Sequence, residues 1–119
     1  MKTTIALSLV LAISSFSAFA STVSCNTVSK KDNEFKSFYF LGKTERVVII
    51  DATTGISYEE NYGGLSIVVQ KKSHMYLSDE NDLVNLNAKY EGRGVYRGIL
   101  KLSTEKEAFS VDVLCSQVN

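Results

Sequence analysis

The sequence predicts an all-β fold: a small antiparallel meander of about eight strands that closes into a barrel or a sandwich, preceded by an N-terminal signal helix. Apolar and polar residues alternate with period two in several runs, which are rich in β-branched and aromatic residues. The gaps between these runs are too short for a crossover helix, so sequential strands are expected to be antiparallel neighbours. Proline is absent, so strand interruptions fall on glycines and polar turns.

The N-terminal segment has the three parts of a secretory signal peptide. Lys2 supplies a positive charge, residues 5–13 form an apolar run, and residues 18–20 form an Ala-x-Ala cleavage pattern. A membrane anchor needs about 20 mostly apolar residues, whereas the stretch from Ile5 to Ala20 has 16 residues and carries four serines. We expect residues 4–19 to form a helix detached from the domain, with cleavage after Ala20. No stable membrane span is then expected in the mature chain.

The leader determines the expected domain boundary and compartment. Removal of residues 1–20 leaves residues 21–119 as a single β domain, a length suited to one modest core. A short leader with a single lysine resembles bacterial ones, so we predict a periplasmic or secreted location. A lipoprotein is an alternative, because residues that partly suit a lipidation box precede Cys25, although Thr22 occupies the position usual for leucine.

The first half of the mature chain contains four predicted strands. Residues 22–28 form a shorter strand candidate, and residues 35–41 are rich in aromatic side chains. Residues 46–52 are β-branched and apolar on both faces, which predicts a central strand. Residues 56–62 form another shorter candidate. These runs are therefore expected to make the first part of the meander.

The second half shows the clearest alternation. Residues 65–72, 84–90, 95–103 and 108–116 each place apolar side chains on one face, and residues 74–77 are a shorter candidate between them. Tight turns are expected at residues 42–44, 54–55, 62–64, 78–82, 92–94 and 103–107. The alternation predicts that these apolar side chains are buried: Ile49, Ile67, Val69, Leu86, Leu100, Leu102, Phe109, Val111 and Val113.

The only two cysteines, Cys25 and Cys115, are predicted to form a disulfide. An exported chain reaches an oxidising compartment, and two cysteines allow only one intramolecular pairing. A catalytic redox pair would usually be a Cys-x-x-Cys motif, and a zinc site would need more ligands than these two and His74, the single histidine. The bridge would bring the first strand against the last one and staple the seam of the meander. Lipidation of Cys25 remains the alternative.

Composition and motifs exclude several function classes. The formal net charge is zero, whereas a general nucleic-acid binder carries a basic excess. Residues 79–82 are an acidic run but lack the pattern of a calcium-binding loop, so a solvated turn is expected. No nucleophile or activating base accompanies His74 in the sequence. We therefore predict no catalytic residues, no metal site and no cofactor.

The remaining candidates for a binding surface are tyrosines, because their side chains combine apolar area with a polar tip. The function predicted is that of an exported small β-barrel, a binding or inhibitor-type module without catalytic activity. Its partner would be an unknown protein or envelope component. The alternatives are a small-ligand carrier with a barrel cavity or, less favoured, a lipoprotein or outer-membrane component. The tyrosine candidates are Tyr58, Tyr62, Tyr76 and Tyr96.

Overall fold

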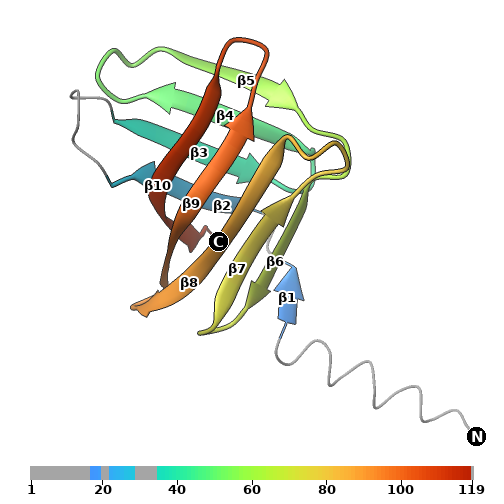
Figure 1. Ribbon diagram of the computed structural model, residues 1–119, viewed down its shortest axis with the longest axis vertical. Coiled ribbons are helices and arrows are strands. Elements are labelled where there is room, and N and C mark those ends of the chain that lie inside the picture. Colours follow the sequence, from blue (N-terminus) through green and yellow to red (C-terminus); the bar gives the residue numbers. More distant parts are fainter. Residues whose placement is uncertain (1–16, 20–21, 29–34, 119) are drawn as a thin grey trace, which may run out of the picture.

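A computed structural model describes residues 17–19, 22–28 and 35–118 of the chain. This described part is all-β, without a helix, and forms a single antiparallel sheet (Figure 1). Its ten strands are β1 (Ser17–Phe19), β2 (Thr22–Thr27), β3 (Lys36–Leu41), β4 (Arg46–Asp51), β5 (Ser57–Asn61), β6 (Ser66–Gln70), β7 (His74–Ser78), β8 (Val84–Gly92), β9 (Val95–Ser103) and β10 (Ala108–Gln117). Nine of them belong to the predicted mature domain, against about eight expected.

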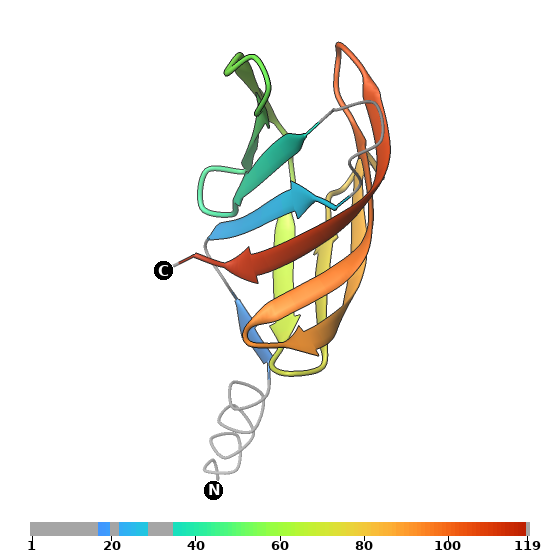
Figure 2. The same cartoon turned by 90° about the vertical axis from the view of Figure 1, so that its left-hand side faces the viewer.

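The sheet consists of two meanders joined side by side. Its strand order is β1-β6-β7-β8-β9-β10-β2-β3-β4-β5, so β6 to β10 form one meander and β2 to β5 form the other. Pairing of β10 with β2 joins them, which confirms that the first and last strands of the mature domain meet. Figures 1 and 2 show the two meanders curling toward each other across the core. The result is one curled half-barrel sheet.

The predicted closure is wrong between β5 and β6. These two strands follow each other in the chain but stand at separate positions in the strand order. Between them, the Tyr62 amide donates to the Glu45 carbonyl at 2.7 Å, and the Glu80 amide donates to the Gly63 carbonyl at 3.1 Å. Gly64 has φ +74°, in the left-handed region that favours glycine. The expected turn therefore exists, but it carries the chain from one meander to the other instead of making a hairpin.

The core lies between the two meanders and follows the predicted alternation. Of the nine side chains expected to be buried, seven are buried, and the other two, Phe109 and Val111, are half-buried against the core. Both precede Val113, where the pairing of β10 with β2 begins, so within the described residues no strand pairs with them on that side. Phe109 instead packs edge-on against Phe38, with ring centroids 5.2 Å apart.

A close approach of two strands also shapes the meander of β6 to β10. Gly98 on β9 lies opposite Ala88 on β8. A methyl group at Gly98 would lie 2.5 Å from the Asn87 carbonyl oxygen and 2.9 Å from the Ala88 Cα. Both contacts are too short, and the backbone atoms involved cannot easily move aside. Glycine at this strand position therefore allows the close approach of the two backbones.

The predicted disulfide is present at the junction of the two meanders. Cys25 on β2 and Cys115 on β10 are direct register partners, both fully buried, and their Cα atoms lie 4.0 Å apart. The bond is consistent with an oxidising, exported compartment. It also occupies the Cys25 sulfur, which lipidation would require, so the bridged form cannot be a lipoprotein acylated at this residue.

The predicted N-terminal helix, residues 4–19, falls mostly outside the described residues. Its last three residues are a correction: Ser17–Phe19 form strand β1, which pairs antiparallel with β6. The physical reason is that β6 is otherwise an edge strand, and an edge offers free backbone donors and acceptors. Within the described ranges, the structure contains no helix long and apolar enough to cross a membrane.

Candidate functional site

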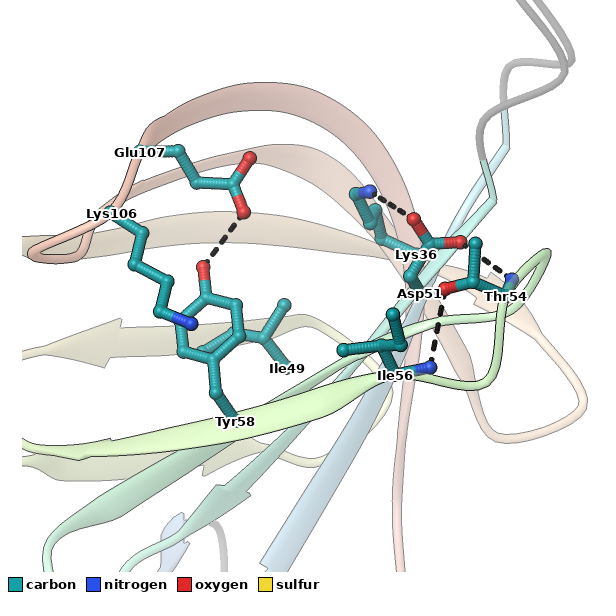
Figure 3. A pocket seen from close by; sticks show the side chains of 8 residues that line it. All are labelled: Lys36, Ile49, Asp51, Thr54, Ile56, Tyr58, Lys106 and Glu107. Carbon is teal, nitrogen blue, oxygen red and sulfur yellow. Dashed lines mark hydrogen bonds and ion pairs between the residues drawn. The ribbon is translucent and has the colours of Figure 1, made fainter.

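A cleft of about 270 Å³ opens between the β4–β5 turn and the β9–β10 turn. The start of β3, the end of β4, the β4–β5 turn and β5 form one wall, and the β9–β10 turn forms the other. Figure 3 shows apolar and charged side chains converging on it. The lining residues are Lys36, Ile49, Asp51, Thr54, Ile56, Tyr58, Lys106 and Glu107.

The shape of the β4–β5 turn results from its own polar side chains. The Asp51 carboxylate accepts hydrogen bonds from the amides of Thr53 at 2.9 Å and Thr54 at 3.2 Å. The Thr54 hydroxyl accepts one from the Ile56 amide at 3.2 Å, and Gly55 between them has φ +78° (Figure 3). The turn leaves Ile56 67% exposed at the mouth of the cleft, although it is a large apolar side chain.

An ion pair between Lys36 and Asp51 lies beside this turn. Lys36 donates to Asp51 at 3.0 Å, and the Lys36 side chain is only 14% exposed. This hydrogen bond, together with those from the Thr53 and Thr54 amides, lowers the pKa of Asp51 below its ordinary value. Asp51 is therefore ionised at neutral pH but already paired, so it orders the cleft wall more than it offers a free charge.

Tyr58 connects the two walls of the cleft. Its hydroxyl donates to Glu107 at 2.8 Å (Figure 3). The same hydroxyl lies 3.2 Å from the Thr104 hydroxyl, and both partners belong to the β9–β10 turn. The Lys106 ammonium lies 4.6 Å from the centre of the Tyr58 ring, a cation–π distance. Partial burial and the neighbouring Glu107 raise the pKa of Tyr58, so its proton stays in place. Of the four tyrosine candidates, this one lines the cleft.

A more acidic hollow of about 430 Å³ continues the cleft along β5. It shares Tyr58 and Lys106 with the first cleft, and the Glu105 amide donates to the Glu60 carboxylate at 2.8 Å across it. Arg46 neutralises Glu59 at 2.9 Å on the outer side. The lining residues are Tyr58, Glu59, Glu60, Asn61, Glu105 and Lys106, so carboxylates outnumber cations here.

The other tyrosine candidates lie elsewhere. Tyr62 is 2% exposed and donates to the Ser103 carbonyl at 2.8 Å, and burial raises its pKa. Tyr96 is buried at the opposite end of β9, where its hydroxyl accepts from the Lys72 amide at 3.1 Å. Tyr76 stacks on His74 on the outer face of β7, with ring centroids 5.7 Å apart. The four tyrosines therefore do not share one surface.

A separate cleft of about 220 Å³ lies at the end where Tyr96 is found. Tyr90 packs against Tyr96 there, with ring centroids 5.0 Å apart, and the Tyr90 hydroxyl accepts from the Gly94 amide at 3.1 Å. Lys71 and Lys72 stand exposed at its rim. The Tyr90 and Tyr96 hydroxyls thus both hold turns, so a structural role explains these two tyrosines without a ligand.

The polar residues considered for catalysis or metal binding have local roles. The Asp79 carboxylate accepts from the amides of Leu83 at 2.8 Å and Val84 at 2.9 Å, so it shapes the β7–β8 turn. One ring nitrogen of His74 lies 2.9 Å from the Ser73 hydroxyl. In the described ranges, no three histidine, cysteine or acidic side chains gather as a metal site would require.

Comparison with protein-family models, curated proteins and solved structures found no significant match for this chain. The function is therefore inferred from the geometry of its own residues. Among the lining residues, only Ile49, as a core residue, and Tyr58, as a binding candidate, had been singled out from the sequence. A turn at residues 54–55 was expected from the sequence, but the hydrogen bonds from Thr53 and Thr54 to Asp51 were not, and neither were the strand and turn that lie opposite.

Proposed function

We propose that this protein is an exported, disulfide-bonded binding module of the inhibitor type, and that it captures a partner protein without catalysing a reaction. The main observation is the cleft beside β5. Exposed apolar surface at Ile56 adjoins side chains already held in place by Lys36–Asp51 and Tyr58–Glu107 contacts. A preorganised surface of this kind binds with little ordering cost.

The size and charge of the cleft favour one kind of contact. About 270 Å³ accommodates a single large side chain, and the neighbouring hollow carries an excess of carboxylates. A lysine or arginine of the partner could pack its aliphatic stem on Ile56 and Tyr58 while its charge approaches Glu107 or Glu105. We therefore propose that a basic side chain on an envelope or secreted protein occupies the cleft.

The small-ligand carrier is the second candidate and receives less support. Twenty apolar side chains fill the core between the two meanders. The cleft is open to solvent and slightly smaller than the roughly 300–1,000 Å³ typical of ligand pockets. An outer-membrane barrel would need Lys89, Arg97, Lys101 and Asp112 to line its lumen. These residues instead lie between core residues along β8, β9 and β10, on the outer face, which gives this alternative less support.

The proposal is tested by changing the exposed apolar residue of the cleft. The exported protein is cross-linked to its partner in the cell envelope or medium, and binding to the purified partner is then measured by calorimetry. We expect Ile56→Asp to weaken binding at least about ten-fold, because it replaces the exposed apolar contact at the mouth of the cleft with a charge. Ile99→Asp is the matched control, because Ile99 is 50% exposed on the outer face of β9.

Two results would contradict the proposal. One is unchanged affinity in Ile56→Asp together with a loss in Ile99→Asp, which would move the binding site to the outer face. The other is loss of function in a folded His74→Ala variant. That loss would support a catalytic role for the single histidine, whereas a binding module should tolerate the change.

A further inference from the structure

The sheet has two free edges in the predicted mature domain, and they differ in charge. Both edge strands are five residues long: β5 has the sequence SYEEN and β6 has the sequence SIVVQ. Natural edge strands often carry charges that prevent pairing with another chain. Glu59 and Glu60 provide this protection on β5, whereas β6 contains no charged residue.

The structure also shows that β6 accepts a strand. β1 pairs with it antiparallel, with Ser17 opposite Gln70, Ala18 opposite Val69 and Phe19 opposite Val68. These three residues belong to the predicted leader. Cleavage after Ala20 would remove β1 and leave β6 as an uncharged edge with its backbone groups free.

We propose that the processed protein forms a dimer of two copies through antiparallel pairing of their β6 strands about Val68. A twofold axis at this residue places Ser66 opposite Gln70 and Ile67 opposite Val69 of the second copy, so no charges oppose each other. The outer faces of the two Val68 side chains, half-buried in one chain, then form a cross-strand apolar pair. The two sheets become continuous.

Symmetry explains why a second copy pairs through β6 and not through β5. An isologous interface brings the central residue of the strand against itself. On β6 this residue is Val68, which favours pairing. On β5 it is Glu59, and two carboxylates directly opposite each other repel. The proposed interface is separate from the cleft, which lies on β4, β5 and the β9–β10 turn, so it does not depend on the proposed binding function.

The dimer is expected to be weak. Two five-residue strands contribute little area beside the roughly 1,200–2,000 Å² that stable complexes bury. Association should therefore become visible only toward high concentration. Sedimentation velocity of the exported protein between about 10 μM and about 1 mM covers the relevant range of dissociation constants. Intact-mass measurement first establishes that the chain begins at Ser21.

Substitution at the twofold axis tests the geometry. We expect Val68→Lys to lower the association constant about ten-fold or more, because it places two ammonium groups opposite each other on the outer face. Ser57→Lys is the matched control, because it adds the same charge to the other edge strand, at an exposed position. Far-UV circular dichroism identical to that of the unchanged protein shows that both variants remain folded.

The outcomes are distinguishable. Concentration-dependent association that is lost in Val68→Lys and retained in Ser57→Lys supports the proposal. It is overturned by a processed protein that stays monomeric to about 1 mM, by association that Val68→Lys leaves unchanged, or by exported protein that begins at Met1. In the last case the leader strand would remain available to cover β6.

Discussion

The two lines along which the meanders could meet are built in opposite ways. On one side, β10 and β2 share five register pairs and the Cys25–Cys115 bond. On the other side, β5 and β6 do not pair at all. Side chains and single backbone contacts hold that side, including Tyr62 to the Ser103 carbonyl and Tyr58 to Glu107. The first line is called the seam below, and the second is called the open side.

The difference shows how a small sheet can combine rigidity with a usable surface. Complete closure would have paired β5 with β6 and removed both edges. The seam instead carries the covalent link, while the open side carries the free edges and the cleft. Local stability is expected to follow the same division, because regions held by few side-chain contacts open at lower free energy than paired strands. Binding surfaces often occur in such regions.

The largest effect is expected from breaking the seam. Replacing both Cys25 and Cys115 with alanine removes the covalent link between β2 and β10. The two cysteines are 90 residues apart in the sequence, so the link closes most of the chain into a loop. The free energy of unfolding should fall by about 2–5 kcal/mol, because the unfolded chain gains conformational freedom. Urea unfolding monitored by circular dichroism measures this loss. The unchanged protein in a reducing agent should show a similar loss, and equal midpoints in all three samples would contradict the assigned role of the seam.

A smaller effect is expected on the open side. Tyr62→Phe keeps the buried ring but removes the hydroxyl that donates to the Ser103 carbonyl. The free energy of unfolding should fall by about 1–2 kcal/mol, because a hydrogen bond is lost and a carbonyl is left without its donor. Tyr76→Phe is the control, and its effect should stay within about 0.5 kcal/mol. A larger loss in Tyr76→Phe than in Tyr62→Phe would show that Tyr62 does not hold this side together.

The strands and the seam were predictable because their signals are local or leave one solution. The bounds predicted for residues 95–103 agree with β9, since alternation along a strand depends only on which face is buried. The Cys25–Cys115 pairing followed from the presence of two cysteines alone. Contact of the first and last strands could then be inferred without knowledge of the packing.

The open side was not predictable, because its cause is long-range. A tyrosine followed by two glycines suits a hairpin turn as well as a passage between meanders. The outcome depends on Tyr62 reaching Ser103, which is 41 residues away in the sequence. The cleft has the same origin: Asp51 forms a recognisable local turn, but Glu107 and Lys106 approach it only after the sheet has curled.

The smallest effect is expected from the Lys36–Asp51 pair at the wall of the cleft. The pKa of Asp51 is lowered in the folded protein, so the pair stabilises folding when the pH is above the ordinary value of 3.8. This stabilisation is lost as the pH falls through the lowered folded-state value, because protonation removes the negative charge. Lys36→Met keeps the aliphatic stem but cannot donate to Asp51. Its stability relative to the unchanged protein should therefore be lowest near pH 6, and the difference should narrow as the pH falls through the folded-state value.

Urea midpoints measured across this pH range test whether the two proteins converge. Asp51→Asn combined with Lys36→Met should show no further pH-dependent difference, because both partners of the pair are then neutral. The Arg97–Asp112 pair near the seam is the comparison, since it has a contact of 2.6 Å but lies on the outer face away from the cleft. If the Lys36→Met difference does not narrow as the pH falls, the loss comes from packing of the lysine stem and not from its charge. The cleft wall would then be held by apolar contacts, and acid would leave the proposed partner binding at Ile56 intact.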